Sequence, residues 1–144
     1  MKKFKFTMQT LLNVKLTLEK QKIGELSNCN ARIRELERQQ EENYALQGEH
    51  TARYTEILEE GLPVAEMRVW RVAFMALRDR IALQAAQIDN AYVERAQIQE
   101  ALVALMQERK MLEKLREKQL EEYKVLQQAE DTAAAQEFLS HKIY

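Results

Sequence analysis

The side chains that could do chemistry in this chain are few, and their spacing does not bring them together. His50 and His141 have no second histidine or cysteine at ligand spacing, so the sequence predicts no metal site. Acidic residues come as adjacent pairs such as Glu41 and Glu42, and neighbours on a helix point about 100° apart, which keeps them from forming an acid–base couple. No phosphate-binding glycine loop and no Ser/His/Asp set is present in the sequence. We therefore expect no enzyme, no catalytic residue and no cofactor.

Composition excludes several further classes. Cys29 is the single cysteine, so no intramolecular disulfide is possible, and we expect a small buried side chain there. A net charge of -1 offers no bulk attraction for nucleic acid or an anionic membrane. The lysines at the start resemble a secretory signal, but Phe4–Thr7 follow instead of an apolar core, and no apolar run is long enough to cross a bilayer. These observations predict a cytoplasmic protein without a transmembrane segment.

The elements that position these side chains are long helices, because one apolar stripe with heptad spacing runs from Met67 to Leu126. Its members are Met67, Trp70, Phe74, Leu77, Ile81, Gln84, Ile88, Ala91, Arg95, Ile98, Leu102, Leu105, Arg109, Leu112, Arg116, Gln119, Tyr123 and Leu126. Thirteen of these eighteen residues are apolar. A seven-residue repeat of this length predicts a supercoiled helix that packs along a partner helix.

Only one point in the chain predicts a reversal of direction. Gly61 can end a helix in the left-handed conformation, and Pro63 suits the first turn of the next helix. We expect helix one at about 7–60, a bend at 61–63, helix two at about 63–136 and a frayed C-terminal tail. So short a loop forces antiparallel neighbours. The predicted fold is all-α: a long antiparallel two-helix coiled-coil hairpin, with residues 1–144 as a single domain.

Folding the chain at this bend pairs residues whose numbers add up to about 124. The predicted apolar pairs are Tyr54 with Trp70, Ile33 with Ala91, Leu26 with Ile98, Leu18 with Leu105, and Leu11 with Leu112. Helix one is more polar between Glu37 and Glu49, and Gly24 and Gly48 lie in its interior, so we expect local loosening there.

Polar residues on the stripe have two interpretations. They are Gln84, Arg95, Arg109, Arg116 and Gln119. Polar core positions in coiled coils fix register and direction. Alternatively, the seam opens at these positions to bind a partner.

Two groups of surface residues stand out. Aromatic residues gather near the bend: Tyr44, Tyr54, Trp70 and Phe74. Trp70 and Phe74 are expected to cap the seam. At the opposite end, a cationic run begins at Arg109, and lysines surround Phe4 and Phe6 at the start of the chain. These rings should be covered by the neighbouring helix or by a partner.

Several short motifs, in their order around the bend, resemble the flagellar FliJ family. The carrying segments are Phe4-Lys5-Phe6-x-x-Gln9-Thr10-Leu11-Leu12-x-Val14, Gly61-Leu62-x-x-x-Glu66-Met67-Arg68-x-Trp70, Glu108-Arg109-Lys110-x-Leu112-Glu113-Lys114-Leu115-Arg116-Glu117, then Tyr123, and Glu137-Phe138. Together they cover nearly the whole chain. Two departures are local: Pro63 stands where the family often has a Ser- or Ala-rich helix start, and residues 139–144 follow no family pattern.

The resemblance implies a fold similar to the central stalk of rotary ATPases and a place in the bacterial flagellar type III export apparatus. FliJ-like proteins insert one end into the pore of the hexameric export ATPase (FliI-like), promote its assembly and activity, and contact the export gate (FlhA-like). The alternatives are a general coiled-coil chaperone or escort for export substrates or their chaperones, and the injectisome counterpart of the stalk.

Residues follow from this comparison as expectations. For the ATPase ring we expect contacts from Phe4, Phe6, Arg109, Lys110 and Lys114. For the gate we expect contacts from Tyr44, Gln47, Tyr54 and Arg71. The resemblance also implies peripheral association with the inner membrane at the flagellar base. Charge-balanced outer faces on both helices would favour a monomer.

Overall fold

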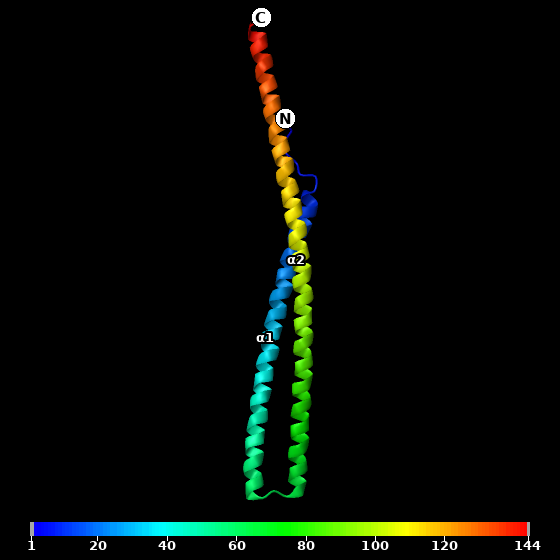
Figure 1. The fold of residues 1–144 in the computed structure, drawn as a ribbon, viewed down its shortest axis with the longest axis vertical. Helices are drawn as coiled ribbons and strands as arrows, with labels where there is room; N and C mark the ends of the chain where they lie inside the picture. The colour runs from blue at the N-terminus through cyan, green and yellow to red at the C-terminus, as the bar shows by residue number, and fades with distance from the viewer. Residues whose placement is uncertain (1, 144) are drawn as a thin grey trace. The chain divides into compact units, whose positions relative to one another are not determined.

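Two α-helices make up almost all of the chain (Figure 1). The computed structural model describes residues 2–143, which contain helix α1, Gln9–Glu60, and helix α2, Val64–Ile143, and no strand. The two helices pack against each other as a helical hairpin, which confirms the predicted fold class. Helix α1 begins slightly later than expected because Thr7 and Met8 form a turn.

The bend between the helices is built as glycine and proline chemistry predicts. Gly61 has a φ of 94°, a left-handed value that a residue with a Cβ adopts only with strain. Its N–H donates to the carbonyl of Leu58 at 3.2 Å, which closes the end of α1. The Pro63 carbonyl accepts from the N–H groups of Glu66 and Met67 at 3.0 and 3.1 Å. Pro63 therefore lies directly before α2 and caps its first turn.

The chain divides into two compact units, each with its own packing. Residues Gly24–Glu100 form one, which we call the bend unit. Its core contains Cys29, Ile33, Ala91 and Ile98, with Leu26 and Leu36 packed against them. The predicted pairs of Ile33 with Ala91 and Leu26 with Ile98 therefore meet in one cluster. The Cys29 thiol is buried, as expected, and its Sγ lies 3.5 Å from the Ala91 carbonyl oxygen.

The second unit consists of Met1–Ile23 and Ala101–Tyr144, and we call it the end unit. Its core is formed by Phe6, Leu12 and Leu112, with Phe4 and Leu115 against them. The predicted contact of Leu11 with Leu112 is wrong, since Leu11 is 40% exposed and Leu12 takes its place. The reason is that Phe6 enters this core from the non-helical segment and Leu12 packs beside it.

The apolar stripe of α2 has the predicted phase. Every predicted position from Met67 to Leu112 is buried or half-buried; beyond it Gln119 and Tyr123 are half-buried, and Arg116 and Leu126 are exposed. The predicted register would pair Arg116 with residue 8, just before α1 begins at Gln9. Burial along the stripe therefore weakens where the partner helix is missing. Leu18, expected opposite Leu105, is likewise only partly covered.

Helix α2 continues past its expected end near Gln136 to Ile143. Side chains from residue 124 to residue 142 are exposed, so packing does not explain this extension. The segment is rich in alanine, glutamine and glutamate, which have high intrinsic helix propensity. High helix propensity therefore explains why this segment, which was expected to fray, is helical.

Candidate functional site

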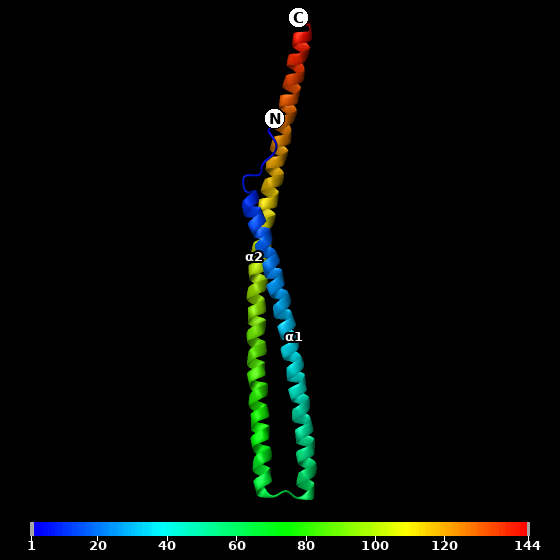
Figure 2. The same cartoon turned by 180° about the vertical axis from the view of Figure 1, so that it is seen from behind.

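Residues 2–8, which we call the N-terminal strap, are held against α2 within the end unit (Figures 1 and 2). The Tyr123 hydroxyl donates to the carbonyl of Lys2 at 2.6 Å. The Phe4 and Tyr123 rings lie 5.6 Å apart, and the Arg116 guanidinium lies 5.7 Å from the Phe4 ring centroid. Phe6 is 7% exposed and anchors the strap in the core. The strap thus has one fixed path along α2.

An open groove of about 960 Å³ lies between the strap and α2. It is lined by Lys2, Lys3, Phe4, Lys5, Tyr123 and Glu130. The three lysines are exposed, while Phe4 is half-buried. A single carboxylate faces three ammonium groups, so the groove presents excess positive charge around an aromatic floor. Such a surface suits an anionic protein segment that also carries apolar side chains.

The five residues expected to meet the ATPase lie in different environments in the structure. Phe6 lies in the core, and Arg109 is held by Glu19 at 2.5 Å and by Glu113 at 3.1 Å. These two carboxylates raise the pKa of Arg109, and the hydrogen bond that Arg109 donates to Glu19 is the larger cause. Phe4 is half-buried, whereas Lys110 and Lys114 are exposed. Phe6 and Arg109 are therefore engaged within the hairpin, whereas the two lysines are open to solvent.

In the bend unit, four rings form one cluster across the two helices. Tyr54 lies 5.7 Å from Trp70 and 5.5 Å from Phe74 between ring centroids. His50 completes the cluster at 6.0 and 6.3 Å from the same two rings, edge-on. Its Nδ1 is buried without a hydrogen-bond partner among the described residues. The predicted register already pairs residue 50 with residue 74, so this neighbour could have been found from the sequence.

A groove of about 490 Å³ lies beside this cluster. Its lining residues include Tyr54, Met67, Arg68, Arg71, Phe74 and Met75. Two of the four residues expected to meet the gate, Tyr54 and Arg71, thus share one groove. Tyr44 is 52% exposed and Gln47 is half-buried, and neither of them lines it. Met67 was predicted as a seam residue, but neither it nor Arg68 nor Met75 was predicted to line a groove.

Three of the five polar residues on the seam have polar partners within the hairpin. The Asn43 amide donates to Gln84 Oε1 at 2.6 Å, and Gln84 is only 8% exposed. Arg95 lies 3.5 Å from the Asn30 side-chain oxygen. Together with the Arg109 ion pair, these contacts link α2 to α1 at three levels of the seam. This favours the interpretation that polar seam residues fix the register.

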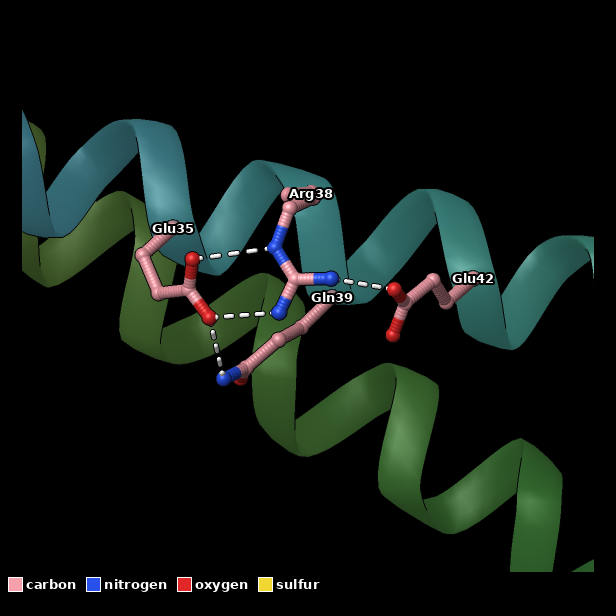
Figure 3. Close-up of polar contacts among 4 residues, drawn as sticks. All are labelled: Glu35, Arg38, Gln39 and Glu42. Atoms are coloured by element: carbon pink, nitrogen blue, oxygen red, sulfur yellow. Dashed lines mark hydrogen bonds and ion pairs between the residues drawn. The ribbon is translucent and has the colours of Figure 1, made fainter.

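The outward side of α1 in the bend unit is charged and internally paired (Figure 3). Arg38 donates to the two carboxylate oxygens of Glu35 at 3.0 and 2.6 Å and also to Glu42. Gln39 donates to Glu35 at 3.2 Å. The hydrogen bond from Arg38 holds the pKa of Glu35 below its usual value. This face is a satisfied, solvated surface.

No group of three potential metal ligands occurs in the part of the chain that the structure describes. Within residues 2–143, neither helix contains a segment long and apolar enough to span a bilayer.

A family model described as Flagellar FliJ protein matches residues 4–144 of the chain. No curated protein and no solved structure matches it.

Proposed function

Because the chain belongs to the FliJ family and is thus a component of the flagellar export apparatus, we propose that it is a non-enzymatic stalk between the export ATPase and the export gate. Residues 1–144 act as a single hairpin domain in this role. The end unit enters the hexameric ATPase (FliI-like) and promotes its assembly and activity. The bend unit contacts the gate (FlhA-like). The protein works at the flagellar base, peripherally associated with the inner membrane.

The observation that carries the ATPase contact is the strap with its lysines. Phe6 in the core and the Tyr123 hydrogen bond fix the strap. Lys2, Lys3 and Lys5 are therefore displayed from an ordered backbone, which lowers the entropic cost of binding. Lys110 and Lys114 lie four residues apart on α2 and add cations on the same unit. Ammonium groups on a slim helical pair suit a ring pore lined with carboxylates.

The gate contact is supported by the groove near the bend. Tyr54 offers an aromatic ring with a hydroxyl, and Arg71 offers a guanidinium in the same groove. Aromatic and arginine side chains commonly dominate the binding energy of protein interfaces. Tyr44 adds an exposed ring elsewhere on α1.

The test of the ATPase contact is titration of ATP hydrolysis by the cognate purified ATPase with this protein. A stalk should saturate once each ring holds one copy, whereas a chaperone should suppress substrate aggregation in proportion to its own concentration. Charge reversal at Lys110 and Lys114 together should abolish the stimulation. Arg109 is left unchanged, because its removal would leave the Glu19 carboxylate without its partner.

A matched control reverses Arg34 and Arg53, two exposed arginines on α1 in the bend unit. This double reversal changes the net charge as much as the lysine reversal does, and the variant should stimulate ATP hydrolysis as fully as the wild type. For the gate, replacing Tyr54 and Arg71 by alanine should weaken gate binding and spare ATPase stimulation. If the lysine pair and the Tyr54/Arg71 pair impair the same partner equally, the division of labour between the two units is refuted.

A further inference from the structure

Helix α2 carries a second stripe with heptad spacing on its outer side, within the bend unit. Its positions are Ala65, Val69, Val72, Ala76, Asp79, Leu83, Ala86, Asn90 and Val93. Seven of these nine residues are apolar. From Val69 onward each follows a seam position by two residues, which turns it about 200° round the helix. The stripe therefore faces away from α1 and extends for about 40 Å.

This outer stripe is exposed along its length. Val69, Val72 and Leu83 are 69%, 66% and 61% exposed, and the alanines are exposed as well. The outward side of α1 differs from this stripe because it is charged: Arg38 forms ion pairs there with both Glu35 and Glu42 (Figure 3). Isolated surface valines are ordinary, but a contiguous apolar row in a seven-residue repeat is typical of a helix that packs on another helix. The monomer expectation rests on charge-balanced outer faces, whereas the outer stripe of α2 is mostly apolar.

We propose that the outer stripe of α2 packs, antiparallel, on the same stripe of a second copy of this chain. In the register where residue numbers add up to about 155, core positions of the two copies alternate as antiparallel coiled coils require. Val69 then faces the partner's Ala86, and Val72 faces the partner's Leu83. Ala76 faces the partner's Asp79. Larger side chains meet smaller ones at most levels, which allows the two helices to approach closely.

Charges next to the stripe select this pairing. In the same register the flanking Arg68 meets the partner's Asp89, and the two-fold axis makes this contact twice. Neither residue has an ion pair among the described residues. A parallel, in-register arrangement would instead keep Arg68 and the partner's Asp89 about 30 Å apart along the helix axis, so they could not pair. Asp79 has only a 3.9 Å contact with its neighbour Arg78, and the partner's Arg80 lies within reach of it in this register.

The balance of charge also favours a second copy over a partner of strong net charge. Between residues 64 and 94 the chain has four arginines and four carboxylates. Three of the four carboxylates, at positions 79, 89 and 94, come after most of the arginines, which occupy positions 68 to 80. An antiparallel copy brings the acidic end of one stripe to the basic end of the other. A strongly acidic or basic helix would leave half of these charges unmatched.

Sedimentation equilibrium of the full chain over a wide concentration range tests the pairing. The expected result is a reversible shift from 17.0 kDa towards twice that mass as concentration rises. Val72→Arg should abolish the shift, because it places a guanidinium in the apolar layer against the partner's Leu83. Val103→Arg is the matched control: Val103 is also an exposed valine of α2, 52% exposed, and lies beyond the stripe. Circular dichroism confirms that both variants remain helical.

A charge swap fixes the register and does not depend on buried residues. Arg68→Asp alone and Asp89→Arg alone should each weaken dimerisation at least tenfold. The double variant should recover it, because the ion pair is then restored with its signs exchanged. A single 17.0 kDa species at all concentrations overturns the proposal. So does a dimer that survives Val72→Arg, or a double variant that dimerises no better than the single ones.

Discussion

Truncating Ile33 to alanine should destabilise the hairpin by about 3 kcal/mol. Ile33 is 3% exposed and packs against Cys29, Ala91 and Ile98. The change removes three carbon atoms, and transfer of each buried methylene is worth about 0.8 kcal/mol, or about 2.4 kcal/mol in all. A cavity term adds to this, but it should be small because a layer of only two helices can collapse.

The matched control is Ile23→Ala, the same chemical change at a position of α1 that is 52% exposed. It should alter stability by less than about 0.5 kcal/mol. Leu102→Ala should lie between the two, at about 1–2 kcal/mol, since Leu102 belongs to the stripe but is only half-buried. Ile98→Ala, at 9% exposure, should resemble Ile33→Ala.

Urea unfolding followed by circular dichroism measures these differences, with the slope m checked for each variant. A constant m with shifted midpoints assigns the change to stability. If Ile23→Ala costs as much as Ile33→Ala, the helices pair through other faces and the reasoning is refuted. If the chain unfolds in two separate steps, the bend and end units do not act as a single domain.

Further substitutions test three local features: the glycines, the polar seam pair and Glu35. Gly48→Ala should stabilise α1 by up to about 1 kcal/mol, because a Cβ there meets nothing within 4 Å. Gly61→Ala should destabilise the protein by a similar amount, because Gly61 has a φ of 94°. Thermal unfolding distinguishes the increase in stability from the decrease. Gln84→Ala should cost about 1–2 kcal/mol by leaving the Asn43 amide unpaired in the seam, and replacing both residues by leucine should restore stability in urea unfolding. The hydrogen bond from Arg38 lowers the pKa of Glu35, so the Glu35 carboxylate stabilises the helix at any pH above its ordinary pKa of 4.5. This stabilisation is lost as the pH falls through the pKa that Glu35 has in the folded protein. The difference in helicity between wild type and Glu35→Gln should therefore shrink in acid.

The seam could be predicted from sequence because burial in a two-helix coil repeats with a fixed period. Every stripe position from Met67 to Leu112 obeys that period, and the bend at Gly61 set the pairs that meet in the bend unit, such as Ile33 with Ala91. The same register places His50 opposite Phe74, although nothing in the sequence marked His50 as a member of the aromatic cluster.

The end unit could not be predicted in the same way, because its packing does not depend on helix periodicity. Phe6 reaches the core from a segment without regular structure, and Leu12 then replaces Leu11 at the interface. The role of Arg109 is a similar case. Its position on the stripe was predicted, but the sequence does not reveal that Glu19 lies 2.5 Å away and occupies its guanidinium.

The end of α2 at Ile143 is a third feature that the seam pattern does not predict. Its last part gains nothing from packing, so an argument based on the seam alone stops too early. Alanine-rich helical propensity decides that segment, and such propensity is most effective in a helix that is already nucleated.

Two residues that line the groove near the bend also flank the outer stripe, so the two proposed interactions in the bend unit should compete. Arg68 and Met75 line the groove and also flank the stripe, where the second copy would cover them. Binding of the gate in the groove and pairing of two copies would therefore exclude each other, and linkage makes the effect reciprocal. Adding purified gate protein should dissociate the dimer in sedimentation experiments. Val72→Arg, which stays monomeric and leaves the groove intact, should bind the gate more tightly than the wild type at concentrations where the wild type is dimeric. A stable complex containing two copies of the chain and the gate would show that the two surfaces are independent.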